Sequence, residues 1–284
     1  MATVLETRHE TVAPDEFARA IEVFARGFSF ARSFTHPYVA ERLAPNGTES
    51  RAGTLWVLRD ADRRSGAYRK EEWVSHGLPP EHVHAAAEGS PWRERTRACR
   101  STGARGGYSV CAIHATDEPE GPLRDGFKSL GYRLGGTEPF MIHRLRRIPR
   151  VSAPAVIRRV RTAALADCLA KAARIRQILP EHLGEDSPQR QYVAMAGDAI
   201  VGWVGSIAVG DATWCQNMYV APPYRRRGIA RAMLCRLLRD DRAAGTVLAV
   251  LLASHTGAKL YASVGYAQIG TLLFFTPSRK SATD

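Results

Sequence analysis

Residues 222–230 read Pro222-Pro223-Tyr224-Arg225-Arg226-Arg227-Gly228-Ile229-Ala230. A strand-like segment precedes them at 214–220, and a helix-like segment follows at 231–242. Prolines end a strand because they cannot donate a ladder hydrogen bond, and the first N–H groups of a helix have no partner within it. A strand, a short basic loop with a glycine and a helix N-terminus therefore predict a site for an anionic phosphate group.

The side chains of this loop fit such a site. Gly228 lets a phosphate approach the backbone, and Ala230 is small enough to permit the same approach. Arg225, Arg226 and Arg227 surround the loop with positive charge for direct contact with a phosphate. No Gly-Lys-Ser/Thr follows, so this is not a Walker loop. The alternative interpretation is a solvated basic turn before an ordinary helix.

The spacing Arg225-x-x-Gly228-x-Ala230 resembles the Arg/Gln-x-x-Gly-x-Gly/Ala signature of the GNAT superfamily of acyl-CoA N-acyltransferases. A second segment, 254–266, resembles the later GNAT segment that reads small-x-x-Gly/Ala-x-x-Leu-Tyr-x-x-x-Gly-Phe/Tyr. Between them, 246–253 is an apolar run consistent with a buried parallel strand. The resemblance implies an α/β (α+β) fold with a mixed central sheet and flanking helices.

The resemblance also implies that acetyl-CoA is the cosubstrate, with its pantetheine arm between two strands that splay apart. Backbone groups of Met218 and Val220 would bond to that arm, and a backbone N–H near Met218 or Tyr219 would hold the oxyanion. Ser254 replaces the asparagine common at its position, and its hydroxyl can still bond to the cofactor. The cofactor-binding residues we expect are Met218, Tyr219, Val220, Arg225, Arg226, Arg227, Gly228, Ile229, Ala230 and Ser254.

Tyr261 is the residue that we expect to carry chemistry. A phenol with a pKa near ~10 can donate its proton to the departing CoA thiolate, and the resemblance implies this role. The alternative is an aromatic residue that packs in the core beside Leu260. The attacking amine must be neutral, so a general base or a bound water takes its proton. The candidates for the base, none of them preferred, are Glu181, His182, Glu185, Asp186, His36 and Glu138.

A chain of 284 residues predicts about two domains. The segment 146–154 holds two prolines and no helical period, so we expect it to link a domain at 1–147 to one at 155–284. The second would be the catalytic acetyltransferase domain. The first contains an internal echo, since 127–132 resembles 261–266, which suggests tandem GNAT-like copies.

The first copy departs from the pattern in two ways. Phe127 stands where the tyrosine would be, and 83–94 contain no Arg-x-x-Gly-x-Gly/Ala loop. We therefore expect this half to bind no CoA and to act as an accessory domain. Its role would be to wall the acceptor site or to set an interface.

The local patterns predict the following elements. Helices are expected at 14–26, 70–74, 80–87, 123–130 and 163–177, the last capped by Thr162. Strands are expected at 55–58, 108–115, 139–145, 155–161, 191–196, 199–209 and 267–275, with a hairpin turn at Gly197-Asp198.

The formal charge of +12 bears on which classes of partner the protein can bind. Few of the 40 basic residues are lysines, a usage typical of a GC-rich genome. No dense basic stripe is interleaved with aromatic residues, which disfavours nucleic acid as a partner. The positive charge also disfavours a polycationic acceptor.

Five cysteines, an odd number without a Cys-x-x-Cys motif, are typical of free thiols in a reducing cytoplasm. The polar segment 1–14 is not a signal peptide, and no apolar stretch approaches the ~20 residues that span a bilayer. We therefore expect no membrane location. His82 and His84 alternate, but no further ligands fall at metal spacing, so we also expect no metal site.

Three functions stay open. The first is an N-acetyltransferase that transfers an acetyl group from acetyl-CoA to a primary amine of a small molecule by direct attack. The second is acylation of a protein amine or of an aminoacyl-tRNA, and the third is a non-catalytic acyl-CoA-binding module. Tyr261 favours an enzyme, and the large first half favours a small substrate. The resemblance also leaves a homodimer open.

Overall fold

The computed structural model describes residues 8–32, 38–43, 55–61, 68–76, 110–117, 119–129 and 132–277. Its elements in chain order are α1 (Pro14–Arg32), β1 (Tyr38–Leu43), β2 (Leu55–Ala61), β3 (Tyr68–His76), β4 (Val110–Ala115), α4 (Glu120–Ser129), β5 (Tyr132–His143), β6 (Val156–Arg159), α5 (Ala163–Ala173), η1 (Pro180–His182), β7 (Gln189–Ala196), β8 (Ala199–Val209), β9 (Ala212–Val220), η2 (Pro222–Tyr224), α6 (Ile229–Ala243), β10 (Leu248–Leu252), α7 (His255–Val264) and β11 (Ala267–Pro277).

The chain forms two compact units, each discontinuous in sequence. Unit 1 contains Met1–His9, Glu22–Ala31 and Met141–Gln268, and unit 2 contains Glu10–Ile21, Arg32–Phe140 and Ile269–Asp284. This division differs from the sequence boundary we expected, because most of β11 belongs with the earlier part of the chain. The proposed domains at 1–147 and 155–284 therefore stay a prediction.

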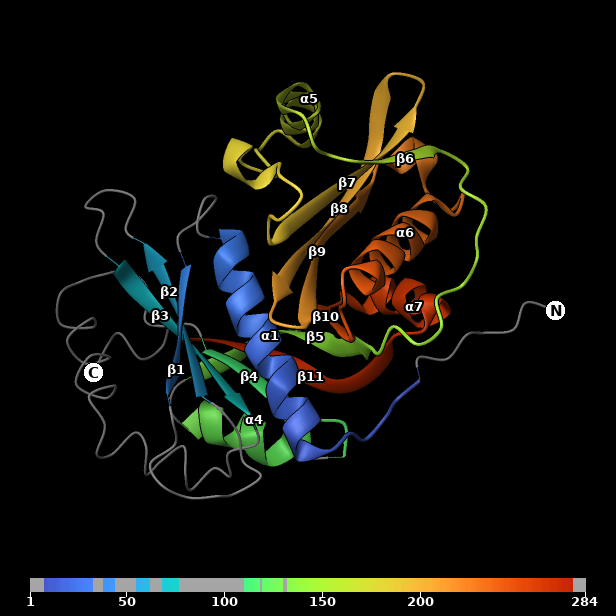
Figure 1. Ribbon diagram of the computed structural model, residues 1–284. Coiled ribbons are helices and arrows are strands. Elements are labelled where there is room, and N and C mark those ends of the chain that lie inside the picture. The colour runs from blue at the N-terminus through green and yellow to red at the C-terminus, as the bar shows by residue number, and fades with distance from the viewer. Residues whose placement is uncertain are drawn as a thin grey trace. The chain divides into compact units, whose positions relative to one another are not determined.

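Unit 1 is built on strands in the order β10-β9-β8-β7-β6. The pair β9–β10 is parallel, and the pairs β8–β9, β7–β8 and β6–β7 are antiparallel. Gly197 at φ 59° and Gly210 at φ 63° occupy the two hairpin turns, where the left-handed backbone favours glycine. Helices α6 and α7 cover one face of these strands, and α5 covers the other (Figure 1).

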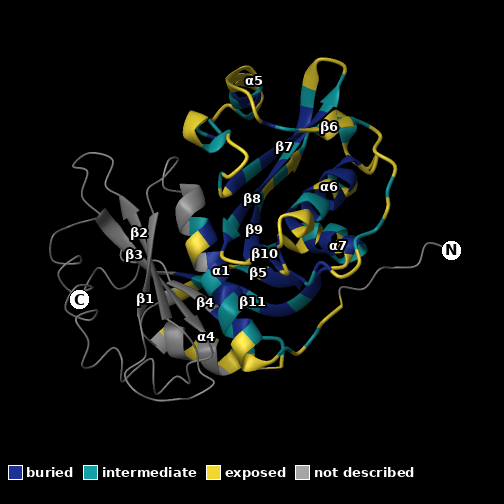
Figure 2. Cartoon of the chain, in the orientation of Figure 1, coloured by how far each residue is buried: buried dark blue, intermediate teal, exposed yellow. Residues whose placement is uncertain are grey.

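Two apolar clusters hold the faces of this sheet. Side chains alternate along each strand, so Tyr192 of β7 joins the cluster under α6 and α7, and Val193 joins the cluster under α5. Figure 2 shows the buried surface running along β8, β9 and α6. The α5 helix begins where we expected, because Thr162 Oγ1 accepts a hydrogen bond from the Leu165 N–H at 3.3 Å.

Unit 2 contains strands in the order β1-β2-β3-β4-β11-β5. The pair β3–β4 is parallel, while β1–β2, β2–β3 and β4–β11 are antiparallel. Gly270 of β11 lies where a Cβ would come within 2.4 Å of the His114 carbonyl oxygen, so only glycine fits there. Phe17 packs edge-on against Phe140, with ring centroids 6.0 Å apart.

One element differs in kind from the prediction. The charged run at 70–74 was expected to be helical, but it lies within β3, and that prediction is wrong. Pairing with β2 overrides the local helix preference, and its register sets Lys70 opposite Asp60 and Glu71 opposite Arg59. The helix expected at 80–87 lies outside the described residues, and β5 begins at Tyr132, before the expected 139.

Candidate functional site

The centre of the site is the point where β9 and β10 part. Their parallel pairing covers three residue pairs, from Leu248↔Ala212 to Val250↔Trp214. Strand β9 then continues to Val220, and β10 ends at Leu252. In this described part of the sheet, Cys215–Val220 therefore have no partner on the β10 side, as the splayed strands of the sequence hypothesis require.

A β-bulge distorts β9 just beyond that point. Gly205 pairs with Gln216 and Trp203 pairs with Tyr219, so Asn217 and Met218 together stand opposite Val204. Asn217 has φ 53°, a left-handed conformation that asparagine tolerates better than most residues. An extra residue disrupts the ladder locally, which frees backbone groups beside Met218.

The expected backbone contacts lie along this bulged segment. Met218 and Val220 pack against the cluster under α6 and α7, whereas Tyr219 lies on the opposite face and stacks on Trp203 at 4.3 Å between ring centroids. The strand thus presents its backbone edge, rather than these side chains, to the gap toward β10.

The loop after β9 turns tightly into α6. The Tyr224 N–H donates to the Ala221 carbonyl at 2.9 Å, and the Arg225 N–H donates to the Pro222 carbonyl at 3.2 Å. Arg226 at φ 62° and Gly228 at φ 82° are both left-handed. Successive N–H groups in such a turn form a concave surface that suits an anion.

Gly228 is the N-cap of α6 and supplies no side-chain cap. A Cβ at this position would meet nothing within 4 Å, so the space above the glycine is open. The first backbone hydrogen bond of α6 runs from the Ala232 N–H to the Gly228 carbonyl. Among the described residues, the N–H groups of Ile229 and Ala230 have no acceptor, so they can bind a phosphate.

The three arginines of the loop differ in the contacts that their guanidinium groups make. Arg225 Nε donates to the Val220 carbonyl at 2.8 Å, and its guanidinium carbon lies 5.9 Å from the Tyr219 ring centroid. Arg227 lies 5.6 Å above the Tyr224 ring, and both it and Arg226 are exposed. Arg225 therefore braces the loop against β9, while Arg226 and Arg227 are free to meet solvent ions.

Tyr261 lies on α7 and is 8% exposed. Its ring meets Tyr266 edge-on at 5.7 Å, within the cluster under α6 and α7. Among the described residues, its hydroxyl has no hydrogen-bond partner. Burial is the main cause that raises the pKa of Tyr261, with a further contribution from nearby Cys215, so the phenol keeps its proton at neutral pH.

The thiols near the site are poor nucleophiles. Burial raises the pKa of Cys215, which Asp241 raises further, and burial also raises the pKa of Cys235. Tyr266 is close enough to shift the pKa of Cys215, but its hydroxyl has no partner of good hydrogen-bond geometry. Neither thiol is therefore a ready thiolate.

Ser254 has a structural task in this site. It is the N-cap of α7, and its Oγ accepts a hydrogen bond from the Gly257 N–H at 3.1 Å. Its hydroxyl proton is not used by that bond, so it can still donate to a ligand.

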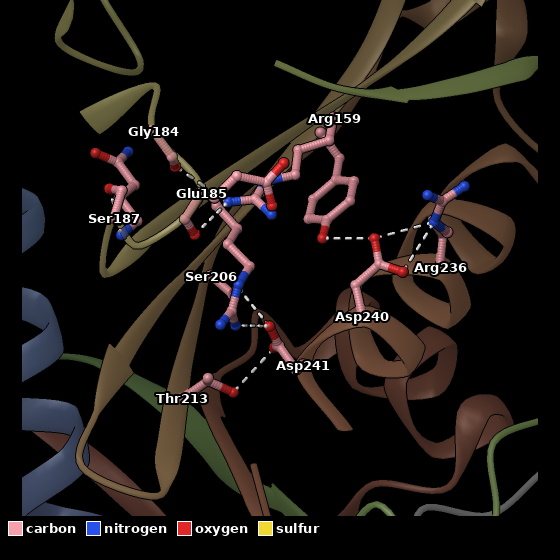
Figure 3. A network of polar contacts seen from close by, with 12 residues as sticks. Arg159, Gly184, Glu185, Ser187, Ser206, Thr213, Arg236, Asp240 and Asp241 are labelled. Carbon is pink, nitrogen blue, oxygen red and sulfur yellow. Dashed lines mark hydrogen bonds and ion pairs between the residues drawn. The ribbon is translucent and has the colours of Figure 1, made fainter. Parts of the chain in front are cut away.

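Among the candidate bases, Glu185 and its backbone are tied to Arg161 and Arg159. Glu185 forms an ion pair with Arg161, and Arg159 Nη2 approaches the Gly184 carbonyl at 3.5 Å and the Glu185 carbonyl at 3.4 Å (Figure 3). These contacts fix that part of the loop to β6, three strands from β9 in the sheet order.

The other candidate bases lie on different segments of the chain. Glu181 and His182 lie in η1, and Asp186 is exposed. Glu138 lies in β5, within unit 2, and His36 lies outside the described residues.

Two amides that we did not predict lie at the site instead. Asn217 Nδ2 donates to Gln177 Oε1 at 3.4 Å, which joins the loop after α5 to the bulge of β9. The signal in the sequence was the asparagine within an otherwise strand-like run, since asparagine is depleted in strands and tolerates left-handed φ.

Among the described residues, no three His, Cys, Asp or Glu side chains are grouped to hold a metal ion. None of the helices in this part of the chain is long and apolar enough to cross a bilayer.

Comparisons with known proteins agree with this geometry. Residues 187–268 match the family model described as an acetyltransferase (GNAT) domain. No curated protein sequence matches the chain at a significant level.

Several solved structures share the fold. A GCN5-related N-acetyltransferase from Kribbella flavida is 14% identical at a TM-score of 0.60, with 92% of this chain and 95% of that chain covered. A GCN5-related N-acetyltransferase from Sphaerobacter thermophilus is 15% identical at a TM-score of 0.55, with coverages of 97% and 98%. A tandem GNAT protein from the clavulanic acid biosynthesis pathway is 15% identical at a TM-score of 0.51, with coverages of 79% and 78%.

The matched segment contains the parted strands, the bulge, the basic loop and α7, so the resemblance drawn from the sequence is confirmed there. A second, degenerate copy in the earlier half stays a prediction. Residues 187–268 therefore match an acetyltransferase (GNAT) domain in sequence, within a fold that is similar to those of solved N-acetyltransferases.

Proposed function

We propose that this protein is an N-acetyltransferase that moves the acetyl group of acetyl-CoA to a primary amine of a small molecule. The observation that carries the proposal is the N-terminus of α6. Its N-cap, Gly228, has a left-handed backbone and open space above it, and it closely follows the segment of β9 that is not paired with β10. A pyrophosphate at this helix N-terminus places a pantetheine arm along the unpaired edge of β9.

The chemistry would follow by direct attack. The amine nitrogen bonds to the thioester carbonyl carbon, and a backbone N–H of the bulge near Met218 stabilises the oxyanion. The C–S bond then breaks, and the Tyr261 hydroxyl gives its proton to the departing thiolate. A water molecule or a base takes the proton that the amine loses.

The thiols near the site favour direct attack over a covalent intermediate. Burial raises the pKa of Tyr261, so its phenol is protonated at neutral pH but is a weaker acid than a solvated tyrosine, and the thiolate must be released close to the hydroxyl to take its proton. An acyl-cysteine intermediate would need a thiolate, and the pKa values of Cys215 and Cys235 are raised by burial. Direct attack avoids the thiolate that an acyl-cysteine route would need, so it is the favoured route.

A calorimetric titration with acetyl-CoA tests the proposal, with thiol release in the presence of primary amines as the second readout. We expect one site per chain. Gly228→Glu should abolish binding, because a side chain there fills the phosphate position and adds negative charge. A folded Gly228→Glu variant that binds acetyl-CoA like the wild type would overturn the assignment of the loop.

Gly245→Glu is the matched control. Gly245 follows the other end of α6, has φ 88°, and would also place a Cβ in open space. The backbone strain and the added charge are therefore similar in the two variants. We expect Gly245→Glu to lose stability and to retain acetyl-CoA binding, which separates loss of the phosphate site from general damage to α6.

A further inference from the structure

The α5 face of β7, β8 and β9 carries a group of uncharged amides beside the bulge. Gln189 and Gln191 alternate with residues that point to α6, and Gln216 stands across Gly205 from Gln191. With the two amides that join the loop to the bulge, they form a set that we call the amide cluster: Gln177, Gln189, Gln191, Gln216 and Asn217.

Hydrogen bonds hold several members of the amide cluster in place. Gln189 Nε2 donates to the Gln177 carbonyl at 2.7 Å, and Gln191 Nε2 donates to the Val204 carbonyl at 3.0 Å. A Cβ on Gly205 would come within 2.9 Å of Gln191 Oε1, so glycine at this position makes room for that amide. The cluster, which lies wholly within the described residues, uses no charged side chain in these bonds.

Two buried polar atoms on this face are unsatisfied. Gln189 Oε1 and Trp214 Nε1 have no hydrogen-bond partner, although Gln189 is 0% and Trp214 is 4% exposed. Both residues pair with Ile207 in the register, so they lie on the same face, two strands apart. A buried acceptor and a buried donor without partners are costly unless a ligand or water completes them.

Aromatic side chains border the cluster. Trp214 packs against Phe24 at 5.2 Å between centroids, and the Trp203–Tyr219 stack lies beyond Gln216 along β9. Amides flanked by aromatic rings suit a small molecule with an uncharged polar group. An acceptor with a second cationic group would instead call for carboxylates, and the Glu185 carboxylate is held at Arg161.

We propose that the amide cluster binds the acceptor through a neutral hydrogen-bonding group, a carboxamide or a hydroxyl close to the reactive amine. This inference rests on the proposed acetyltransferase function. Asn217 lies in the bulge itself, so a molecule held by the cluster has its amine next to the backbone that would bind the acyl group. Gln177 is a positioning residue that holds the loop after α5 against this place.

A panel of matched amines tests the proposal. Glycinamide and ethanolamine carry a neutral group, glycine carries a carboxylate, and ethylenediamine carries a second amine. With acetyl-CoA and thiol-release detection, we expect kcat/KM for the first two to exceed that for the others by about tenfold or more, on the scale of one hydrogen-bonding group in a specificity site. Equal kcat/KM across the panel would overturn the proposal.

Two variants locate the effect. Gln177→Ala and Asn217→Gly each remove one side of the contact, and glycine keeps the left-handed backbone at 217. We expect each to raise KM for glycinamide by about tenfold while the Kd for acetyl-CoA is unchanged, and the double variant to cost little more than either alone. Additive effects, or an unchanged KM, would contradict a shared role in binding the acceptor.

The readouts separate this proposal from the one on which it rests. Failure to bind acetyl-CoA would overturn the acetyltransferase function. Binding of acetyl-CoA without transfer to glycinamide or ethanolamine would leave that function standing and overturn the assignment of the amide cluster.

Discussion

Tyr261 and Ser254 show how single residues in the site serve both packing and chemistry. Tyr261 is packed edge-on to Tyr266 and buried, which by itself describes a core residue. Its hydroxyl nevertheless has no hydrogen-bond partner among the described residues, so it can bond to a ligand. A thiolate released beside it would supply that partner, so the core interpretation and the catalytic one are compatible.

Tyr261→Phe tests the catalytic interpretation. Removing one hydroxyl leaves the ring packing intact, so acetyl-CoA should bind as in the wild type. The loss of a general acid should slow thiol release by about a hundredfold or more. Single-turnover kinetics with saturating acetyl-CoA measure the effect, and an unchanged rate would remove Tyr261 from the mechanism.

Tyr192→Phe is the control for that experiment. Tyr192 is also buried in the cluster under α6 and α7, but its hydroxyl donates to Asp240 Oδ2 at 2.9 Å. This variant should lose some stability and keep its rate of transfer. A slow Tyr192→Phe enzyme would mean that the rate reports packing rather than proton donation.

At the scale of elements, α6 is fixed to the sheet by a buried polar network as well as by apolar packing. Arg190 of β7 donates to Asp241 Oδ1 at 2.6 Å, Ser206 of β8 donates to the same oxygen at 3.0 Å, and Thr213 of β9 donates to Oδ2 at 3.1 Å (Figure 3). One carboxylate near the end of α6 therefore ties together the three strands that precede the site.

Asp241→Ala should destabilise the protein by about 3–5 kcal/mol, because it leaves the guanidinium of Arg190, only 13% exposed, without its partner. Urea denaturation measures the change. Asp167→Ala is the matched control, since Asp167 pairs with Arg176 at 2.8 Å but both side chains are exposed. That variant should cost about 0–1 kcal/mol, and similar losses in the two variants would contradict the network.

The elements that the sequence predicted well are those whose signals are local. The hairpin of β7 and β8 follows from alternation and from Gly197, and α5 follows from the Thr162 cap. The β9 bulge was less accessible, because only Asn217 hints at it. Residues 70–74 were mistaken for a helix because their strand identity comes from the neighbouring β2, which local propensity does not report.

At the scale of the whole molecule, chain order and compact units diverge. Strand β11 follows α7 directly, yet its residues from Gly270 to Phe275 pair with β4 at 110–115. Such a pairing joins segments that are far apart in the chain, and no periodicity or turn residue encodes it. The sequence could therefore suggest two domains without revealing that segments from both ends of the chain enter each unit.

His143 provides a prediction about the stability of unit 1 as a whole. It is 3% exposed, and its Nδ1 accepts a hydrogen bond from the Leu145 N–H at 2.9 Å, which requires the neutral ring. Burial lowers the pKa of His143 below its ordinary value of 6.5, against weaker opposing contributions from backbone contacts at Val264 and Arg147. The folded state therefore resists protonation at a pH where the unfolded chain accepts a proton.

The sign of the effect follows from this difference. Above pH 6.5 the ring is neutral in both states, and the contribution of His143 to the free energy of unfolding is fully present. As the pH falls through 6.5 toward the lower pKa of the folded state, the unfolded chain gains a proton first. The free energy of unfolding therefore decreases over this range. Urea denaturation at a series of pH values measures this loss. His143→Asn keeps an acceptor for the Leu145 N–H without a titrating ring, so its stability should fall less steeply over that range. His255→Asn, at an exposed position, should keep the wild-type slope, and an unchanged slope in His143→Asn would show that other groups cause the acid sensitivity.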